Sequence, residues 1–237
     1  MLTIHPKYLD LRPGQVVVDL GCGQGRHLQA LAWEYPVRIL GFDLDFDSAA
    51  ASRNGLEEIL PAQDGRRRRC LLAAADCPRL PLPEKSVDHL ICSEVLEHLF
   101  DYHRTLLEIR RVLKPGGTLA ISVPRYWPER VCWALSREYQ HDPGGHVRIF
   151  QASSLGLEIQ CLGFAFLGSH HAHALHAPYW WLKCLRWSRR DTWWPVRLYH
   201  RFLVWDMLHK PFATQALEKA LNPIMGKSVV MYFTAQE

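Results

Sequence analysis

The sequence predicts an α/β fold, in which strands and helices alternate around a mainly parallel sheet. Short apolar runs that end in glycine or aspartate alternate with segments of helical spacing along the first half of the chain. The run VVVDL at residues 16–20 is the clearest example, because it leads directly into glycines. Such runs are typical of strands buried on both faces, as in a parallel sheet. Their alternation with helices predicts helical layers on both faces of the sheet, joined by right-handed crossovers.

The expected elements follow one another in a regular order. The predicted strands are 16–20, 38–42, 70–75, 88–92, 118–123, 164–175 with its exit loop, and 227–234. The predicted helices are 27–34, 47–60, 102–113 and 153–163, with a mainly helical stretch over 179–222 that is interrupted at Pro195 and Pro211. The sequence KPGG is expected to end the helix that precedes it, since proline and glycine both stop helices. The charge run at residues 66–69 is expected in a solvated loop.

Length and composition restrict the kind of protein. The chain has 237 residues, 48% of them hydrophobic, which suffices for one substantial core and an added cap. We therefore expect a single domain over residues 1–237. The formal net charge of +4 is too small to indicate a nucleic-acid partner, and none is expected. The 7 cysteines are scattered and form no C-x-x-C pair, which favours reduced thiols and a cytoplasmic location. No secretory signal and no bilayer-spanning run is recognisable.

The turn after the first strand has the spacing D-x-G-x-G-x-G, beginning at Asp19. Glycines allow positive φ angles and let a ligand approach the backbone, and the turn leads into a helix N-terminus. A dinucleotide site prefers G-x-G-x-x-G, and an acid ahead of the glycines would repel a pyrophosphate. Asp19 suits a ligand that carries an ammonium group, such as the methionine end of S-adenosylmethionine. The alternative is a turn with a purely structural role.

Two further acids stand at the ends of the next two predicted strands. Asp43 can accept hydrogen bonds from both hydroxyls of a ribose, as acids at this separation from the glycines do in dinucleotide folds. Asp76 can accept one from an adenine amino group, with the backbone N–H of the next residue facing a ring nitrogen. Helix capping is the alternative role for the nearby Asp45 and Asp47, and a turn is the alternative for Asp76. Open α/β sheets bind ligands at this edge.

Four segments in order, VVVDLGCGQG, ILGFDLD, AADCPRLPLPEKSVDHLICSEVLEHL and LLEIRRVLKPGGTLAISVP, resemble the motifs of class I S-adenosylmethionine-dependent methyltransferases. The most similar branch acts on small molecules and includes the ubiquinone and menaquinone biosynthesis enzymes. The resemblance covers about residues 10–124, with weaker similarity at GGHVRIF and in the last strand. It implies a Rossmann-like seven-stranded sheet whose last strand is antiparallel. Where the family often has an aromatic residue, this chain has Val87, which we interpret as a packing variation.

The resemblance also implies a role for each residue of the cofactor site. It assigns Asp19, Gly21 and Gly23 to the methionine end, Asp43 to the ribose, Asp76 and Cys77 to the adenine, and Ser93 to the sulfonium. An oxygen or nitrogen acceptor can also need a general base. His98 in SEVLEHL is one candidate, although Glu97 and His98 are common in this motif and can instead organise the turn. His146 in GGHVRIF is the second candidate.

Two segments, residues 125–150 and 170–222, are expected to form a helical, aromatic-rich cap inserted in the domain. Both should leave the sheet at the carboxyl ends of parallel strands and therefore lie above the cofactor edge. Their aromatic residues are expected to line an apolar substrate cavity: Tyr126, Trp127, Trp133, Tyr139, Tyr179, Trp180 and Trp181.

The run HHAHALH contributes four clustered imidazoles, of His170, His171, His173 and His176. Clustered histidines can bind Zn²⁺ or another divalent metal. The spacing matches no standard motif, and neither a carboxylate nor a cysteine lies within the run. We therefore expect these histidines to line a pocket or exchange protons, and we expect no metal.

Residues 183–210 carry seven basic and two acidic side chains, a net charge of +5. One helical stripe of this segment holds Trp194, Leu198, Phe202, Trp205 and Leu208. A basic helix with such a stripe can lie on an anionic membrane surface, which allows peripheral contact with the inner membrane face. The alternative is a cap helix packed on the domain with solvated arginines.

The predicted function is methyl transfer from S-adenosylmethionine to a small metabolite. A membrane contact would fit a lipophilic metabolite. The motifs leave the acceptor atom open among oxygen, carbon and nitrogen. One alternative is a protein that binds the cofactor without catalysis, because no base is firmly assigned. Another is an NAD-type oxidoreductase, against which the glycine spacing and Asp19 both count. Methylation of RNA or protein is not supported, since no N-P-P-Y-type motif follows the fourth strand.

Overall fold

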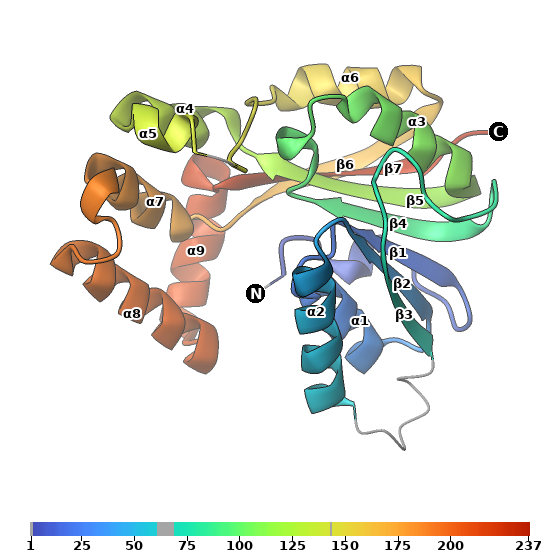
Figure 1. Cartoon of the computed structure of the whole chain (residues 1–237), viewed down its shortest axis with the longest axis horizontal. Helices are drawn as coiled ribbons and strands as arrows, with labels where there is room; N and C mark the ends of the chain where they lie inside the picture. The colour runs from blue at the N-terminus through green and yellow to red at the C-terminus, as the bar shows by residue number, and fades with distance from the viewer. Residues whose placement is uncertain (1, 61–68, 143) are drawn as a thin grey trace.

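The computed structural model describes residues 2–60, 69–142 and 144–237 (Figure 1). Most of the charge run that was predicted as a loop, residues 66–68, lies outside the described residues. The described chain forms a central sheet, helices above and below it, and a helical cap beside it (Figure 1).

The sheet has seven strands in the order β3-β2-β1-β4-β5-β7-β6. The strands are β1 (Val16–Leu20), β2 (Arg38–Asp43), β3 (Cys70–Ala74), β4 (Val87–Ser93), β5 (Leu113–Pro124), β6 (Phe164–Ala172) and β7 (Ser228–Ala235). β7 runs antiparallel to both of its neighbours, and the other described pairs are parallel. This confirms the predicted Rossmann-like sheet, including its antiparallel last strand.

Helices cover both faces of the sheet. The helices α1 (Arg26–Glu34) and α2 (Phe46–Ile59) pack on one face, and α3 (Tyr102–Val112) and α6 (Ala152–Cys161) pack on the other. The predicted helices match these within two residues at each end. Asp45 caps α2 by accepting a hydrogen bond from the Ser48 N–H at 2.9 Å, which confirms the capping role considered for it.

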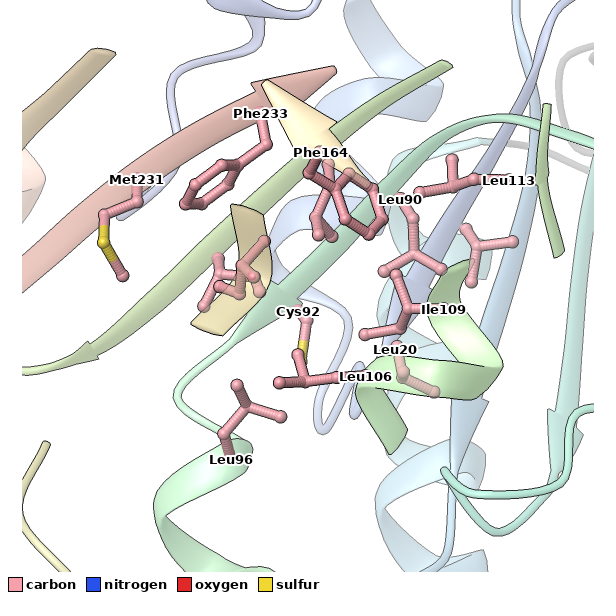
Figure 2. Close-up of a cluster of buried hydrophobic side chains, with 14 of the residues drawn as sticks. Leu20, Leu90, Cys92, Leu96, Leu106, Ile109, Leu113, Phe164, Met231 and Phe233 are labelled. Atoms are coloured by element: carbon pink, nitrogen blue, oxygen red, sulfur yellow. The ribbon is translucent and has the colours of Figure 1, made fainter. Parts of the chain in front are cut away.

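The larger core lies between the sheet and α3 with α6. Figure 2 shows Leu90 and Cys92 of β4 facing Leu106 and Ile109 of α3, all buried. The strand β1 is buried almost throughout because helices cover both of its faces. Its continuous apolar run therefore reports its central place in the sheet.

The KPGG segment differs from the prediction. The helix α3 ends at Val112 as expected, but β5 begins immediately at Leu113 and includes KPGG. Leu113 pairs with Val87, and the register shifts before His89 pairs with Thr118. The extra residues of KPGG are accommodated at this irregularity in the pairing of β5 with β4. Sequence reasoning placed them outside a strand, but the chain already runs along β4 there.

The cap consists of two parts. The helices α4 (Tyr126–Leu135) and α5 (Arg137–Gln140) follow β5, and α7 (His176–Leu185), α8 (Trp194–His209) and α9 (Phe212–Met225) follow β6. As predicted, the prolines lie at helix starts, since Pro195 is in the first turn of α8 and Pro211 precedes α9. Across the part of the chain that the structure describes, no helix combines the length and hydropathy needed to cross a membrane.

We expect Leu90→Ala to lower the free energy of unfolding by about 2–5 kcal/mol, because the side chain is fully buried between the sheet and α3. Leu71→Ala on β3 is the matched control, since Leu71 is 54% exposed and should cost far less. Urea denaturation followed by circular dichroism measures both. Equal losses for the two variants would contradict this description of the core.

Candidate active site

The turn between β1 and α1 is closed on one side and open on the other. The backbone N–H groups of Gly21 and Cys22 donate to the carbonyl of Phe42 at 2.7 and 3.0 Å, which ties the turn to β2. Gly21 and Gly23 have φ angles of +68° and +50°, which glycine adopts without strain. A Cβ atom on Gly21 would collide with Val95, whereas one on Gly23 would meet no atom within 4 Å. The backbone at Gly23 is therefore free to approach a ligand.

Asp43 lies at the end of β2 and holds this turn. Its Oδ2 accepts a hydrogen bond from the Gly23 N–H at 2.7 Å, and its Oδ1 accepts one from the Asp45 N–H at 3.0 Å. Each carboxylate oxygen can accept a second hydrogen bond, so both retain capacity for the hydroxyls of a ribose. The Asp43 carbonyl accepts from the Ala75 N–H at 2.9 Å, which brings the end of β3 beside it.

Asp19 is buried beneath the turn, with 2% of its surface exposed. Its Oδ2 has no hydrogen-bond partner, and burial raises the pKa of this carboxyl to about 7. A buried carboxylate oxygen without a donor is costly. An ammonium group bound in front of the turn would supply the missing donor and charge, so this residue fits the amino-acid end of S-adenosylmethionine.

Asp76 and Cys77 follow β3 and differ in exposure. Asp76 is exposed and lines a shallow cavity of about 430 Å³ together with Pro78, Arg79 and Arg104. Cys77 is buried, and burial together with the carboxylate of Asp76 raises the pKa of its thiol to about 12. The Asp76 carboxylate is thus accessible to a ligand, whereas the Cys77 side chain belongs to the core.

Ser93 at the end of β4 belongs to a network that the sequence analysis did not recognise. Its Oγ lies 2.9 Å from the Oγ of Ser122, its partner in the register of β5. The Ser122 hydroxyl donates to Oε1 of Glu94 at 2.9 Å, and Glu94 has a positive φ of 56°. The position of Glu94 directly after β4 was the available signal, whereas Ser122 required the register of the two strands.

The two candidate bases, His98 and His146, lie together. Their ring centroids are 5.0 Å apart, and a hydrogen bond from the Val147 N–H to the Glu97 carbonyl at 2.9 Å joins their segments. Nδ1 of His98 lies 3.1 Å from the Gly145 carbonyl oxygen. Burial and the neighbouring His146 lower the pKa of His98.

His146 also contacts a buried carboxylate that the sequence analysis missed. Its Nδ1 lies 2.7 Å from Oε1 of Glu129 on α4, and the Tyr139 hydroxyl donates to the same oxygen at 2.8 Å. Glu129 is 1% exposed, and the hydrogen bond from His146 is the main influence that lowers its pKa against the effect of burial. No spacing rule connects a glutamate on α4 with a histidine seventeen residues later in a loop.

Glu97, beside His98 in the sequence, is fully buried, and neither of its carboxylate oxygens has a hydrogen-bond partner. Burial, reinforced by the nearby Glu94, raises its pKa well above the ordinary value. The position of Glu97 supports the structural role considered for the start of this motif.

The cap aromatics lie differently from the prediction. Trp133, Tyr139, Trp180 and Trp181 pack with Trp187 and two buried cysteines into a core between α4, α5 and α7. The ring of Trp127 lies tilted against that of Trp181, with centroids 5.5 Å apart, and its Nε1 donates to the Ile224 carbonyl at 3.1 Å. These side chains pack against one another between the cap helices and do not line an open cavity. Short helices need such a core to pack together.

The histidines of HHAHALH separate into two groups. His170 lies on β6 against Tyr8 and Tyr232. His173 and His176 line a cavity of about 190 Å³ with residues from both ends of the chain. The other lining residues are Thr3, Arg26, Glu94, Met207, Lys227 and Ser228. The cavity reaches Arg26 at the start of α1 and Glu94 after β4, so it borders the cofactor edge.

Comparison with known proteins agrees with this geometry. Residues 18–121 match the sequence family described as "Methyltransferase domain". The "Probable S-adenosylmethionine-dependent methyltransferase" of Mycolicibacterium smegmatis is 30% identical over 165 residues, covering 68% of this chain and 58% of that protein. Trans-aconitate 2-methyltransferase of Azoarcus is 33% identical over 114 residues, covering 48% of this chain and 40% of that enzyme. The chain thus spans 58% or less of the length of these relatives.

The fold is also found in a solved methyltransferase. Geranyl diphosphate C-methyltransferase from Streptomyces coelicolor, in complex with S-adenosyl-L-homocysteine, aligns over 97% of this chain and 76% of its own, with a TM-score of 0.63 at 13% identity. This solved enzyme shares the fold described above. Residues 18–121 match a methyltransferase domain, and this match indicates S-adenosylmethionine as the cofactor.

We expect Asp19→Asn to stabilise the cofactor-free protein above pH 7 by up to about 4 kcal/mol. The folded wild type has a pKa near 7 at Asp19 and the unfolded chain has an ordinary one, so folding takes up a proton between pH 4 and 7. Wild-type stability from this group is therefore lost as the pH rises through that window, and the variant has no such loss.

Urea denaturation of both proteins at several pH values measures this difference. The same variant should bind S-adenosylmethionine more weakly, because the carboxylate that faces the ammonium is gone. A stability difference that stays constant between pH 5 and 8 would contradict the unpartnered, buried state of Asp19.

Proposed function

We propose that this protein transfers a methyl group from S-adenosylmethionine to a small, lipophilic acceptor. The observation that carries the proposal is that Asp19 and Asp43 both adjoin the open turn at Gly23. One acid lacks a donor that an ammonium would supply, and the other has free acceptor capacity beside it. An NAD-type site would instead bring pyrophosphate close to the buried Asp19 carboxyl.

The cofactor supplies a methyl group on a sulfonium, which is already an activated electrophile. The protein therefore needs to hold the acceptor in line with that methyl group and to exclude water. Ser93, Glu94 and Ser122 form a hydrogen-bonded edge at the end of β4, where the resemblance assigns the sulfonium. Their contribution is to orient polar groups at the point of transfer.

A general base, if the acceptor requires one, is best supplied by His146. A carboxylate accepts hydrogen bonds, so the 2.7 Å contact with Glu129 assigns the proton to Nδ1 and leaves Nε2 as the basic nitrogen. The buried carboxylate behind the ring would stabilise the imidazolium that forms when Nε2 takes up a proton. The Nδ1 atom of His98 faces a backbone carbonyl oxygen, that of Gly145, where His146 faces a carboxylate. A neutral carbonyl stabilises an imidazolium less than a carboxylate does.

A lipophilic acceptor is supported by the outer face of the cap. Most of the stripe predicted on α8 faces solvent, with Trp194 70% exposed and Leu208 75% exposed. Phe212 at the start of α9 continues this surface at 87% exposure. Arg186, Arg189, Arg197 and Arg201 are exposed in the same segment. An exposed apolar surface with arginines in the same segment suits an anionic membrane, from which such an acceptor could be drawn.

A groove on the same helix suits an apolar chain. A cavity of about 620 Å³ is lined by Leu182, Trp194, Pro195, Leu198, Tyr199, Arg201 and Phe202. The resemblance to enzymes of ubiquinone and menaquinone biosynthesis also supports an acceptor with a lipophilic tail. The acceptor atom is left open by these observations.

We expect isothermal titration to show binding of S-adenosylmethionine and no binding of NAD. Asp43→Ala should weaken cofactor binding about 10- to 100-fold, because each hydrogen bond to a charged acceptor contributes about 1.5–3 kcal/mol. Asp43→Asn retains the shape and removes the charge, and should show an intermediate loss. Asp47→Ala is the matched control, as Asp47 is exposed on α2. Unchanged affinity in Asp43→Ala would refute the ribose assignment.

The activity itself is tested by transfer of a labelled methyl group to lipid and metabolite extracts. Label should appear in a small lipophilic product with the wild type and be strongly reduced with Asp43→Ala. Tight cofactor binding without labelling of any extract would instead favour the non-catalytic alternative.

We expect the protein to bind vesicles that contain anionic phospholipid at low salt and to leave neutral vesicles unbound. Arg197→Glu with Arg201→Glu should weaken this binding at least about tenfold, since each basic residue near the surface contributes about 1 kcal/mol. Arg38→Glu with Arg53→Glu makes the same change of net charge at exposed positions on β2 and α2, outside the cap, and serves as the control. Wild-type protein that ignores anionic vesicles in a flotation assay would refute the membrane contact.

A further inference from the structure

The helices α8 and α9 each bury a carboxylate while exposing apolar side chains, although α8 also buries Val196 and Leu203. Glu218 is the buried side chain of α9, whereas Leu217 and Ile224 on the same helix are exposed. On α8, Asp206 is buried while the neighbouring Trp205 is exposed. Burying a carboxylate is costly unless it is paired or binds a metal. The buried carboxylates of Asp206 and Glu218 therefore each require a partner for their charge.

The two inward carboxylates meet the histidines that follow β6. One ligand atom from each of His173, His176 and Glu218 lies within 4.8 Å of the other two. The rings of His173 and His176 have centroids 5.4 Å apart. Asp206 is close enough to affect the pKa of both His176 and Glu218. The run HHAHALH contains no carboxylate, but α9 brings one to it from forty-two residues further along the chain.

Several polar atoms of this cluster lack partners. Oε1 of Glu218, Oδ1 of Asp206 and Nδ1 of His176 are buried without a hydrogen bond. Glu218 and Asp206 are 7% and 6% exposed, so water does not solvate these atoms. Native proteins rarely bury polar atoms without a partner. A metal ion that accepts the lone pairs of these atoms would be such a partner.

We propose that His173, His176 and Glu218 bind a divalent transition-metal ion, with Asp206 supplying further negative charge beside it. Imidazole nitrogens together with carboxylate oxygen suit Zn²⁺ and similar ions, whereas Mg²⁺ and Ca²⁺ prefer oxygen ligands alone. Ligands of a tetrahedral zinc ion at 2.0–2.1 Å lie about 3.3 Å apart. The three atoms therefore need to close by an amount on the order of 1 Å, which side-chain rotation provides.

The surroundings of the cluster fit a metal site. The Thr3 hydroxyl lies 2.9 Å from Nε2 of His173, and Arg26 donates to the same hydroxyl at 3.0 Å. Outer contacts of this kind orient ligating histidines. Both histidines also line the 190 Å³ cavity that reaches Glu94, so the fourth position of the ion would face that cavity. Ion binding does not depend on the proposed methyl transfer.

A proton is the competing partner for the buried charge. Burial and the nearby Asp206 raise the pKa of Glu218 to about 7, so a neutral carboxylic acid could occupy this place without an ion. The two explanations differ in what they predict for added metal. A neutral acid gives no zinc affinity, and Glu218→Gln would then leave every metal-binding property unchanged.

The test measures Zn²⁺ binding to the whole chain by equilibrium dialysis and elemental analysis, with Mg²⁺ as the contrasting ion. We expect one tightly bound Zn²⁺ per chain and no comparable Mg²⁺ binding. Glu218→Gln and His176→Ala should each weaken Zn²⁺ binding more than about 100-fold, since even outer contacts contribute about 10- to 100-fold. Glu58→Gln and His200→Ala, at exposed positions on α2 and α8, are the matched controls.

Other outcomes would overturn the proposal. Wild-type protein without stoichiometric Zn²⁺ refutes it directly. Zn²⁺ that survives Glu218→Gln but is lost in His98→Ala would place the ion at Glu97, His98 and His146, the second group of possible ligands among the described residues. Circular dichroism is used to check that each variant is folded, and visible absorption of the Co²⁺-substituted protein reports whether nitrogen ligands are lost in His176→Ala.

Discussion

The hydrogen bond from the Gly23 N–H to the Asp43 carboxylate joins the ends of β1 and β2 at the point where the sheet meets its ligand. It shapes the turn so that the backbone at Gly23 stays open, and it directs the carboxylate across the same space. Asp19 lies beneath this turn with an unpartnered oxygen. The cofactor edge therefore depends on one contact between the neighbouring parallel strands β1 and β2. The rest of the site depends on the sheet order that places these two strands side by side.

Buried carboxylates without hydrogen-bond partners occur at several places in this fold. Asp19, Glu97 and Glu218 are all buried with unpartnered oxygens, and burial raises the pKa of each. Glu129 is the contrasting case, because His146 and Tyr139 satisfy it from within the protein. The cost of an unsatisfied buried carboxylate is large enough that each one requires a proton, an ammonium group or a metal ion.

The cap combines a packed interior with an apolar exterior. Its inner aromatics form a small core around Trp180 and Trp187, whereas Trp194, Leu208 and Phe212 face solvent. An exposed apolar surface of this size often marks a contact with a membrane or with another protein. The same helices that present this surface turn Asp206 and Glu218 inward, so the outer and inner faces of the cap have separate tasks.

Most of the sheet and its acids could be predicted from the sequence. The apolar runs, the glycine turn and the acids at 19, 43 and 76 depend on local patterns, and the rules for parallel sheets then bring strand ends to one edge. The pairs His146–Glu129 and His176–Glu218 could not be predicted, since they join elements whose relative placement follows only from packing of the cap. Local patterns therefore determined the strands and the cofactor edge, and the tertiary structure alone decided which histidines meet carboxylates, because side-chain burial is set by contacts between distant segments.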